Sequence, residues 1–317
     1  MPPERGAAMM HGSFPSGGNL GEEGWSMEMV QLGRTGRRIT RIGLGGMQVS
    51  LPGRPPREQG LGVVRRALEL GVNFIDTADV YCLDDSDLGH NERLIAQALD
   101  EAGMRAQVTV ATKGGLVRPG GRWENDARPE HLRRACERSL QALGVDRIDL
   151  YQLHAPDPKV RFEDSVGEMA RLYEEGLVAA VGLSNVSLMQ LRVAEAIVPI
   201  TSVQNRFNPW DRDSERTGLV RYCDDHRVTF LPYSPVGGHR RVGLLRESPE
   251  LRAIAGRFGA SPEEMVLAWI LGVSPSLVPI PGASREESIE SSVRAESLRL
   301  DQRTLRELEE AFRALPS

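Results

Sequence analysis

The chain has 317 residues, and its 39 lysines and arginines against 44 aspartates and glutamates give a formal net charge of −5. This length suits one large α/β domain whose core needs neither disulfides nor a metal for stability. The charges are spread without a long basic run, which argues against a nucleic-acid partner. No apolar stretch approaches the roughly 20 residues of a transmembrane helix, so no membrane partner is expected.

Residues 1–26 are rich in Gly, Pro and Ser and contain no apolar run typical of a signal peptide. We expect a disordered tail here, or a start assigned upstream of Met27. The three cysteines, Cys82, Cys136 and Cys223, are odd in number and lack metal-ligand or CxxC spacing. Reduced thiols and a cytoplasmic location are therefore expected.

From Met27 onward, short apolar runs alternate with amphipathic helical patterns. A hairpin is predicted first, with strands at 27–32 and 38–42 around the turn 33–36. Eight further strands, each buried on both faces, are expected to end near Leu44, Asp76, Thr112, Leu153, Leu183, Asn205, Tyr233 and Ile280. The helical patterns between them cover residues 62–70, 91–99, 129–143, 162–175, 188–198, 215–225 and 265–271.

Several helices carry explicit boundary signals. Ser261, Pro262 and Glu264 supply an N-cap, a first-turn proline and a capping-box glutamate. Gly71 and Gly144 follow helical patterns where a left-handed C-terminal glycine is expected.

Eight strands with helical crossovers predict a parallel sheet, either a closed barrel or a doubly wound fold. The GxGxxG fingerprint is absent after the first strand, where residues 43–46 read GLGG. We therefore predict the α/β class: a single (β/α)8 TIM barrel with an N-terminal hairpin. One domain is expected over residues 27–317, preceded by the tail of residues 1–26.

Four reactive side chains follow the ends of predicted strands: Asp76, Tyr81, Lys113 and His154. Active sites of such barrels form at this end. Singly, each has a structural explanation, as a turn cap, a packing aromatic, a solvated lysine or a structural histidine. Together they suit proton transfer. A lysine ammonium is expected to lower the pKa of the tyrosine from about 10, an aspartate to hold the lysine charged, and a histidine to orient a substrate oxygen.

A metal site is the alternative for the acidic stretch Asp84, Asp85, Asp87, His90 and Glu92. HExxH is absent, and we interpret this stretch as a solvated loop and helix start with Asn91 as the N-cap. No metal is expected, although a metal-dependent barrel hydrolase remains a rival function.

Seven motifs occur in order along the predicted strands: GVNFIDTADVY at 71–81, ATKGG at 111–115, IDLYQLH at 148–154, GLSN at 182–185, VQN at 203–205, PYSP at 232–235 and PIPG at 279–282. This ordered set resembles the aldo-keto reductase family from about Met27 to the C-terminus. The resemblance implies an oxidoreductase that transfers hydride from NAD(P)H to an aldehyde or ketone. It also implies a catalytic tetrad of Asp76, Tyr81, Lys113 and His154, with Tyr81 as general acid.

The resemblance further implies a cofactor site. Ser184, Asn185 and Gln204 are expected to bond the nicotinamide carboxamide and Tyr233 to stack on the ring; for Ser184 and Asn185, capping of the next helix is the alternative. The residues expected near the cofactor phosphates follow the seventh and eighth strands: Ser234, Pro235, Val236, Gly237, Gly282, Ser284, Arg285 and Ser288. Gly46 and Met47 are further cofactor-binding candidates. Arg285 is the candidate for binding the 2′-phosphate, which favours NADPH as the cofactor, with NADH possible. The alternative is that Arg285 is an ordinary surface arginine.

Four residues are expected to line the substrate pocket: Cys82, Trp123, Ala155 and Trp210. Cys82 stands where many relatives have glycine, and Ala155 where some carry a bulky aromatic. The expected partner is a small carbonyl compound, and the oligomeric state is open. The main rival is an NADPH-binding regulatory subunit of the same fold, resembling channel-associated β subunits.

Overall fold

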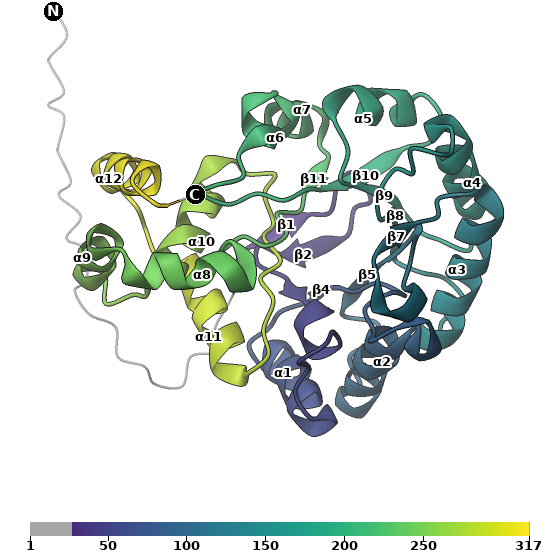
Figure 1. Ribbon diagram of the computed structural model, residues 1–317, viewed down its shortest axis with the longest axis horizontal. Coiled ribbons are helices and arrows are strands. Elements are labelled where there is room, and N and C mark those ends of the chain that lie inside the picture. The colour runs from purple at the N-terminus through teal and green to yellow at the C-terminus, as the bar shows by residue number, and fades with distance from the viewer. Residues whose placement is uncertain (1–26, 317) are drawn as a thin grey trace, which may run out of the picture.

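The structure is a computed structural model that describes residues 27–316, and it shows parallel strands inside a ring of helices (Figure 1). The predicted tail, residues 1–26, lies outside the described residues. Seven strands form one parallel sheet in the order β11-β10-β9-β8-β5-β4-β3. Their bounds are β3 Leu44–Gly45, β4 Phe74–Asp76, β5 Thr109–Gly114, β8 Leu150–Leu153, β9 Val181–Ser184, β10 Ile200–Gln204 and β11 Thr229–Phe230.

An eighth extended segment, residues 278–280, closes this sheet. The amide of Val278 donates to the Phe230 carbonyl at 2.9 Å, so the segment lies beside β11. On its other side the amide of Gly43 donates to the Pro279 carbonyl at 3.0 Å, next to β3. The first and last strands are therefore joined, and the predicted (β/α)8 barrel is confirmed.

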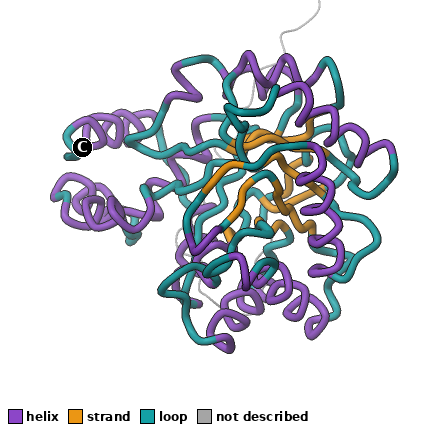
Figure 2. Tube along the Cα trace, turned by 45° about the vertical axis from the view of Figure 1, so that its right-hand side comes forward, coloured by secondary structure: helices purple, strands orange, loops and turns teal. Residues whose placement is uncertain are grey.

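Helices cover the outside of the barrel (Figure 2). Those in or near predicted positions are α1 Arg57–Glu69, α2 His90–Ala102, α3 Pro129–Leu143, α4 Phe162–Glu174, α5 Leu188–Glu195, α6 Asp213–Arg216, α7 Leu219–His226 and α10 Pro262–Val273. Another helix, α11 Glu286–Arg294, follows the eighth extended segment. The single helix expected at 215–225 is two, because Gly218 adopts φ 78° between α6 and α7. Three further helices were not predicted: α8 Gly238–Glu247, α9 Pro249–Arg257 and α12 Gln302–Arg313. Within residues 27–316, no helix is both long and apolar enough to span a bilayer.

The helix boundary signals are confirmed except at α2. Ser261 and Glu264 form the expected capping box, and Gly71 and Gly144 adopt φ 85° and 66°. The cap of α2 is Gly89 in the left-handed region, so the prediction of Asn91 as N-cap is wrong. Asn91 lies in the first turn, and its side chain is buried among other elements instead.

The hairpin of β1 (Met29–Gln31) and β2 (Arg38–Thr40) closes the N-terminal end of the barrel. Leu32 and Ile39 are buried in one apolar cluster with residues of the barrel strands. Those partners are Phe74, Ala111, Leu150, Ala180, Leu231, Val278 and Ile280. This end of the interior is therefore filled by hydrocarbon.

The same strands carry polar residues two positions further on, because alternate residues of a strand face the same side. Phe74 is followed by Asp76, Ala111 by Lys113 and Leu150 by Gln152, and all three polar side chains are buried. Gly182 leaves room for them, since a Cβ there would lie 2.8 Å from the Gln152 Cγ atom. The interior thus changes from apolar to polar toward the C-terminal end.

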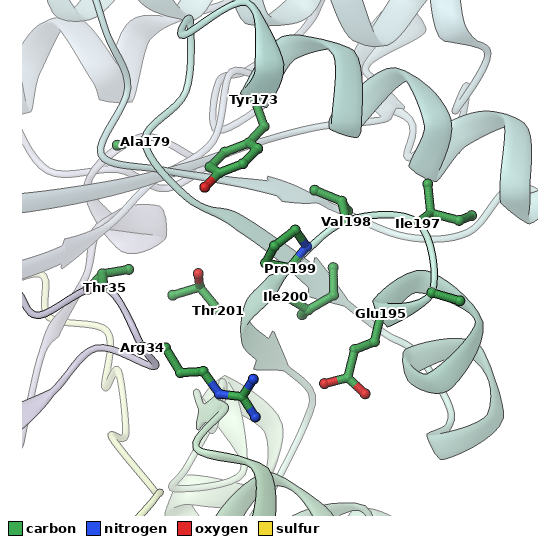
Figure 3. Close-up of a pocket in the computed structure, with 11 residues that line it drawn as sticks. Arg34, Thr35, Tyr173, Ala179, Glu195, Ile197, Val198, Pro199, Ile200 and Thr201 are labelled. Carbon is green, nitrogen blue, oxygen red and sulfur yellow. The ribbon is translucent and has the colours of Figure 1, made fainter.

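A cavity of about 560 Å³ lies at the N-terminal end, outside the polar layer (Figure 3). Arg34 and Thr35 of the hairpin turn line it with Tyr173 and residues 195–201. In barrels of this class, that end serves stability and chemistry takes place at the opposite end. This cavity is therefore not the candidate active site.

Candidate active site

Three of the four predicted catalytic side chains meet at one ammonium group in the polar layer. Lys113 Nζ donates to Asp76 Oδ2 at 2.6 Å, to the Thr77 carbonyl at 2.8 Å and to the Tyr81 hydroxyl at 2.8 Å. Lys113 has no exposed surface, and Asp76 is 2% exposed. The ammonium is therefore fully hydrogen-bonded and fixed against the phenol.

His154 contacts the same phenol. Its ring is nearly perpendicular to that of Tyr81, with centroids 5.8 Å apart. Its backbone is held by β5, since the His154 amide donates to the Gly114 carbonyl at 2.9 Å. The four residues that the sequence pattern selected are thus brought together at the C-terminal end of the barrel.

Burial dominates the protonation of the phenol. The pKa of Tyr81 is raised well above its usual value, first because burial disfavours the phenolate, then because Asp76 and Tyr233 lie nearby. The net direction is opposite to the lowering expected beside an ammonium, because burial of the phenol dominates. Tyr81 is held as a neutral phenol, which is the form a proton donor needs.

Burial also affects the protonation of Lys113 and His154. It lowers the pKa of Lys113, while the negative charge and hydrogen bond of Asp76 act in the opposite direction. The pKa of His154 is lowered well below its usual value, first by burial and then by the charge of Lys113. His154 is therefore a neutral imidazole near pH 7.

Two glutamines support Asp76 from inside the barrel. Its Oδ1 atom accepts hydrogen bonds from Gln204 Nε2 at 2.7 Å and from Gln152 Nε2 at 3.2 Å. Gln152 was not selected from the sequence. Its position two residues after the buried Leu150 was the available signal, because it places the amide on the inner face.

The predicted nicotinamide side begins at the end of β9. The Tyr233 hydroxyl donates to Asn185 Oδ1 at 2.8 Å, and Asn185 Nδ2 donates to the His154 carbonyl at 2.9 Å. Asn185 adopts φ 58°, a strained conformation for a non-glycine residue that often marks functional sites. Neither Asn185 nor the buried Ser184 caps α5, because the cap is Ser187 with Gln190. The alternative of helix capping is thus wrong.

The predicted phosphate loop follows β11. Ser234 and Gly237 adopt φ 49° and 81°, and Gly237 precedes α8. Pro235 is buried and Val236 partly so. Trp210 packs against this loop: a Cβ on Gly237 would lie 2.7 Å from its indole ring. The Trp210 Nε1 atom donates to the Pro316 carbonyl at 2.7 Å. Trp210 therefore lies beside the phosphate candidates and not beside the four predicted catalytic residues.

The second phosphate segment precedes α11. Gly282 is exposed, and Arg285 is the exposed residue before the first turn of this helix. The Ser284 carbonyl accepts from Gln59 Nε2 at 2.8 Å, and the Ser288 amide donates to the Arg285 carbonyl at 3.1 Å. These residues lie at the N-terminus of α11, the end of a helix that favours an anion.

Apolar side chains surround Tyr81. Met47 and Ala155 pack against the cluster that contains Tyr81. Cys82 is buried, its Sγ donates to the Val80 carbonyl at 3.3 Å, and burial raises its pKa to about 12. A thiol with this pKa is no nucleophile near neutrality, which fits a wall residue. Trp123 is 46% exposed and meets the His154 ring edge-on, with centroids 6.4 Å apart.

The acidic stretch is partly buried, contrary to expectation. Asp87 Oδ2 pairs with Arg54 at 2.6 Å, and Asp84 caps a short helical turn at Asp85–Asp87. Glu92 is fully buried and accepts from the Thr112 hydroxyl at 2.6 Å, so the interpretation as a wholly solvated patch is wrong for this residue.

The buried side chain of Asn91 braces the loops around the tetrad. Its Nδ2 donates to the Gly46 carbonyl at 2.8 Å, and its Oδ1 accepts from the Thr77 hydroxyl at 2.6 Å. A Cβ at position 46 would lie 2.5 Å from this Oδ1, so the loop after β3 approaches α2 closely because residue 46 is glycine. Gly46 therefore contacts the segment that carries Asp76.

The comparisons with known proteins agree with this geometry. The model of the aldo/keto reductase family matches residues 41–313. An uncharacterised oxidoreductase of Schizosaccharomyces pombe is 35% identical over 277 residues, covering 86% of each chain. A probable aldo-keto reductase 1 of Glycine max is 32% identical over 314 residues, covering 90% of this chain and 89% of the other.

Solved structures show the same fold. A thermostable aldo-keto reductase, Tm1743, solved with the inhibitor epalrestat, superposes with a TM-score of 0.77 at 32% identity, covering 90% of this chain and all of the other. A glycerol dehydrogenase from Gluconobacter oxydans superposes with a TM-score of 0.78 at 24% identity, covering 89% and 94%. The chain therefore belongs to the aldo/keto reductase family and is an oxidoreductase.

Proposed function

We propose that the protein reduces a small aldehyde or ketone with NAD(P)H, and that Tyr81 gives the proton to the carbonyl oxygen. The observation that carries this proposal is the contact set of one buried ammonium. Lys113 Nζ touches both the Tyr81 hydroxyl and Asp76, with His154 edge-on to the same phenol. Family membership supports the reaction class.

The residues at the rim fit a nicotinamide ring. Arg206 lies over one face of Tyr233 at 5.6 Å from the ring centroid, which leaves the opposite face for stacking. The Gln204 Nε2 atom donates a hydrogen bond to Asp76. Among residues 27–316, the Gln204 Oε1 atom accepts no hydrogen bond. That oxygen suits a carboxamide NH₂ donor. With Ser184 and Asn185, these residues would hold the ring, which supplies hydride when bound.

Arg285 supports NADPH over NADH. Its side chain is exposed beside the exposed Gly282 and the first turn of α11, and among the described residues it forms no ion pair. A guanidinium that is free of carboxylates suits a phosphate. Residues 234–237 would line the pyrophosphate.

The proton path follows from the protonation states. The neutral Tyr81 donates its proton to the oxygen as negative charge develops there, and the remaining phenolate is stabilised by Lys113 at 2.8 Å. Asp76 keeps that ammonium charged and in place. The neutral His154 directs the carbonyl toward the phenol by hydrogen bonding, without competing as an acid. A cytoplasmic location and a small-molecule partner complete the proposal.

Tyr81→Phe tests the assignment of Tyr81. Loss of a general acid is expected to lower kcat by about 10²- to 10⁴-fold. Binding of NADPH, followed by fluorescence titration, is expected to remain. The matched control is Tyr151→Phe, which removes a buried phenol that bonds the Leu132 carbonyl at 3.2 Å, away from the tetrad. Undiminished turnover by Tyr81→Phe with a panel of carbonyl compounds would exclude the assigned role.

The wild-type protein is first assayed with the same panel and with both NADPH and NADH. Oxidation of the nicotinamide is expected with at least one carbonyl compound. Tight binding of NADPH without any oxidation would instead favour the regulatory subunit, and hydrolysis that a chelator abolishes would favour the metal-dependent hydrolase.

A further inference from the structure

Arg118 is a buried cation for which the proposed mechanism has no role. It follows the short strand β6 (Leu116–Val117) at the active-site end of the barrel and is only 2% exposed. Its Nη2 donates to the Leu83 carbonyl at 3.0 Å. Its Nε and Nη1 are buried and have no hydrogen-bond acceptor within residues 27–316.

Asp84 is close enough for the charge of Arg118, after the hydrogen bonds from Ser86, to contribute to the lowering of its pKa, but it does not pair with the guanidinium. In the described part of the chain Arg118 forms no ion pair. Asp87 is paired with Arg54 at 2.6 Å, and Asp84 Oδ1 accepts from the amide and the hydroxyl of Ser86. A buried charge without a counter-charge is costly, and buried polar groups are nearly always hydrogen-bonded. An arginine with two unpartnered N–H groups beside the candidate active site is therefore able to bind an anion.

A chain of aromatic contacts links Arg118 to the reacting phenol. Its guanidinium lies over the Trp123 ring at 4.1 Å from the centroid, Trp123 meets the His154 ring at 6.4 Å, and His154 meets Tyr81 at 5.8 Å. Arg118 also opposes the rise in the pKa of Cys82, the residue after Tyr81. The guanidinium is thus one indole away from the tetrad.

Trp123 covers one face of the guanidinium. It is 46% exposed, and among the described residues its indole makes no hydrogen bond. It lies in the turn between β6 and β7 (Glu124–Asn125), which contains Gly120 and Gly121 at φ 55° and 81°. Rotation of this one side chain would uncover Nε and Nη1 toward the substrate side.

We propose that Arg118 is the anion subsite of the substrate pocket, and that the preferred substrates are aldehydes or ketones bearing a carboxylate. The carbonyl end would lie between Tyr81 and His154, and the carboxylate would accept hydrogen bonds from Nε and Nη1 once Trp123 turns aside. Charge-assisted hydrogen bonds from arginine to carboxylate are among the strongest in proteins. This inference rests on the proposed carbonyl reductase function.

The experiment compares two probes of similar size, 4-formylbenzoate and its neutral methyl ester. The ester group withdraws more electron density, so the intrinsic reactivity of the aldehydes favours the ester, and a preference for the acid must come from binding. Steady-state kcat/KM is measured for each with NADPH. The wild-type protein is expected to prefer the acid by about tenfold or more, because hydrogen bonds to charged groups are of that strength. Turnover of the ester without preference for the acid overturns the inference but leaves the proposed function intact. Turnover of neither probe, nor of any other carbonyl compound, rejects both.

Variants then assign the preference to one residue. Arg118→Met is expected to lower the acid-over-ester ratio about 10- to 100-fold, whereas Arg118→Lys retains part of it, because lysine keeps the charge but not the planar donors. The matched control is Arg122→Met, which removes an exposed arginine of the same turn that pairs with Glu124. A merely structural role for Arg118 would lower both activities and leave their ratio unchanged.

Trp123→Ala provides a second test that does not require Arg118 to be replaced. Removing the cover is expected to raise the acid-over-ester ratio, since Nε and Nη1 become accessible without rotation of the indole. An unchanged or lower ratio in this variant contradicts the placement of the anion beneath Trp123.

Discussion

Lys113 and Arg118 are buried cations five positions apart in the chain, but their surroundings differ. Lys113 Nζ has three oxygen partners within 2.8 Å, one of them the carboxylate of Asp76. Arg118 has one carbonyl partner and an aromatic face, and within residues 27–316 no carboxylate. Within the described residues, one cation therefore has all its hydrogen-bond partners, and the other has two N–H-bearing nitrogens without a partner.

This difference separates two roles in one pocket. A group that stabilises a developing charge works best when it is held rigidly before the substrate arrives. A group that selects a substrate gains most when its own hydrogen bonds are completed only by that substrate. The contacts of Lys113 fit the first role, and those of Arg118 fit the second.

The largest effect is expected from Lys113→Met, which removes the ammonium that bonds Asp76, Thr77 and Tyr81. It leaves Asp76 buried without its counter-charge, so the free energy of unfolding should fall by about 3–5 kcal/mol. Urea denaturation measures this loss. The turnover number should fall by at least about 10²-fold, because the phenolate left after proton transfer is no longer stabilised. A stability change below 1 kcal/mol would show that the pair contributes little and that the comparison is wrong.

His154 lies between the two regions and provides a smaller, pH-dependent effect. Its folded pKa is well below the unfolded value of about 6.5, so the unfolded chain binds this proton first as the pH falls. Its contribution to stability is therefore complete above about pH 6.5 and is lost below it, at up to about 1.4 kcal/mol per pH unit. His154→Gln should flatten the loss between pH 6.5 and 5 in urea titrations. His90 and His131, whose pKa values are also lowered by burial, still contribute in this variant.

The control for this titration is His239→Gln, which replaces an exposed histidine of α8. Parallel stability curves for the wild-type protein and His154→Gln would mean that His154 is not held neutral, and the assignment as a neutral orienting group would fail.

The smallest effect is expected for the free energy of unfolding of the Arg118→Met variant. Replacing a buried charge that has no counter-charge by an apolar side chain of similar length should change the free energy of unfolding by less than about 1 kcal/mol, or increase it. The same denaturation assay as for Lys113→Met gives the answer. A loss of several kcal/mol would indicate that Arg118 already has its partners and serves the fold.

Much of the architecture was predictable because its signals are local. α3 spans Pro129–Leu143 as expected, since Pro129 fits a first helical turn and Gly144 the left-handed C-terminus. The capping box of α10 was predicted from Ser261 and Glu264 alone. The meeting of Asp76, Tyr81, Lys113 and His154 was predictable because parallel strands place their carboxyl ends at one end of the barrel. Each case needed only a short window of sequence and one rule of the fold.

The remaining features depend on contacts between distant segments. Asn91 reads as a helix cap, yet its side chain is bound by Gly46 and Thr77 from other loops. Lysine beside tyrosine suggests an acidic phenol, but the depth of burial reverses the direction of the shift. Arg118 looks like an ordinary loop arginine until Trp123 and Leu83 enclose it. None of these environments is encoded within a few residues of the group concerned.

The closure between the first and last strands has a consequence for the thermal stability of the protein. The bonds from Gly43 to Pro279 and from Val278 to Phe230 join strand pieces of only a few residues. The loops that continue from this seam are those proposed to grip the dinucleotide, at residues 234–237 and 282–285. A dinucleotide bound by both loops would hold the two sides of this seam together, so the melting temperature of the protein should rise with the concentration of the nucleotide.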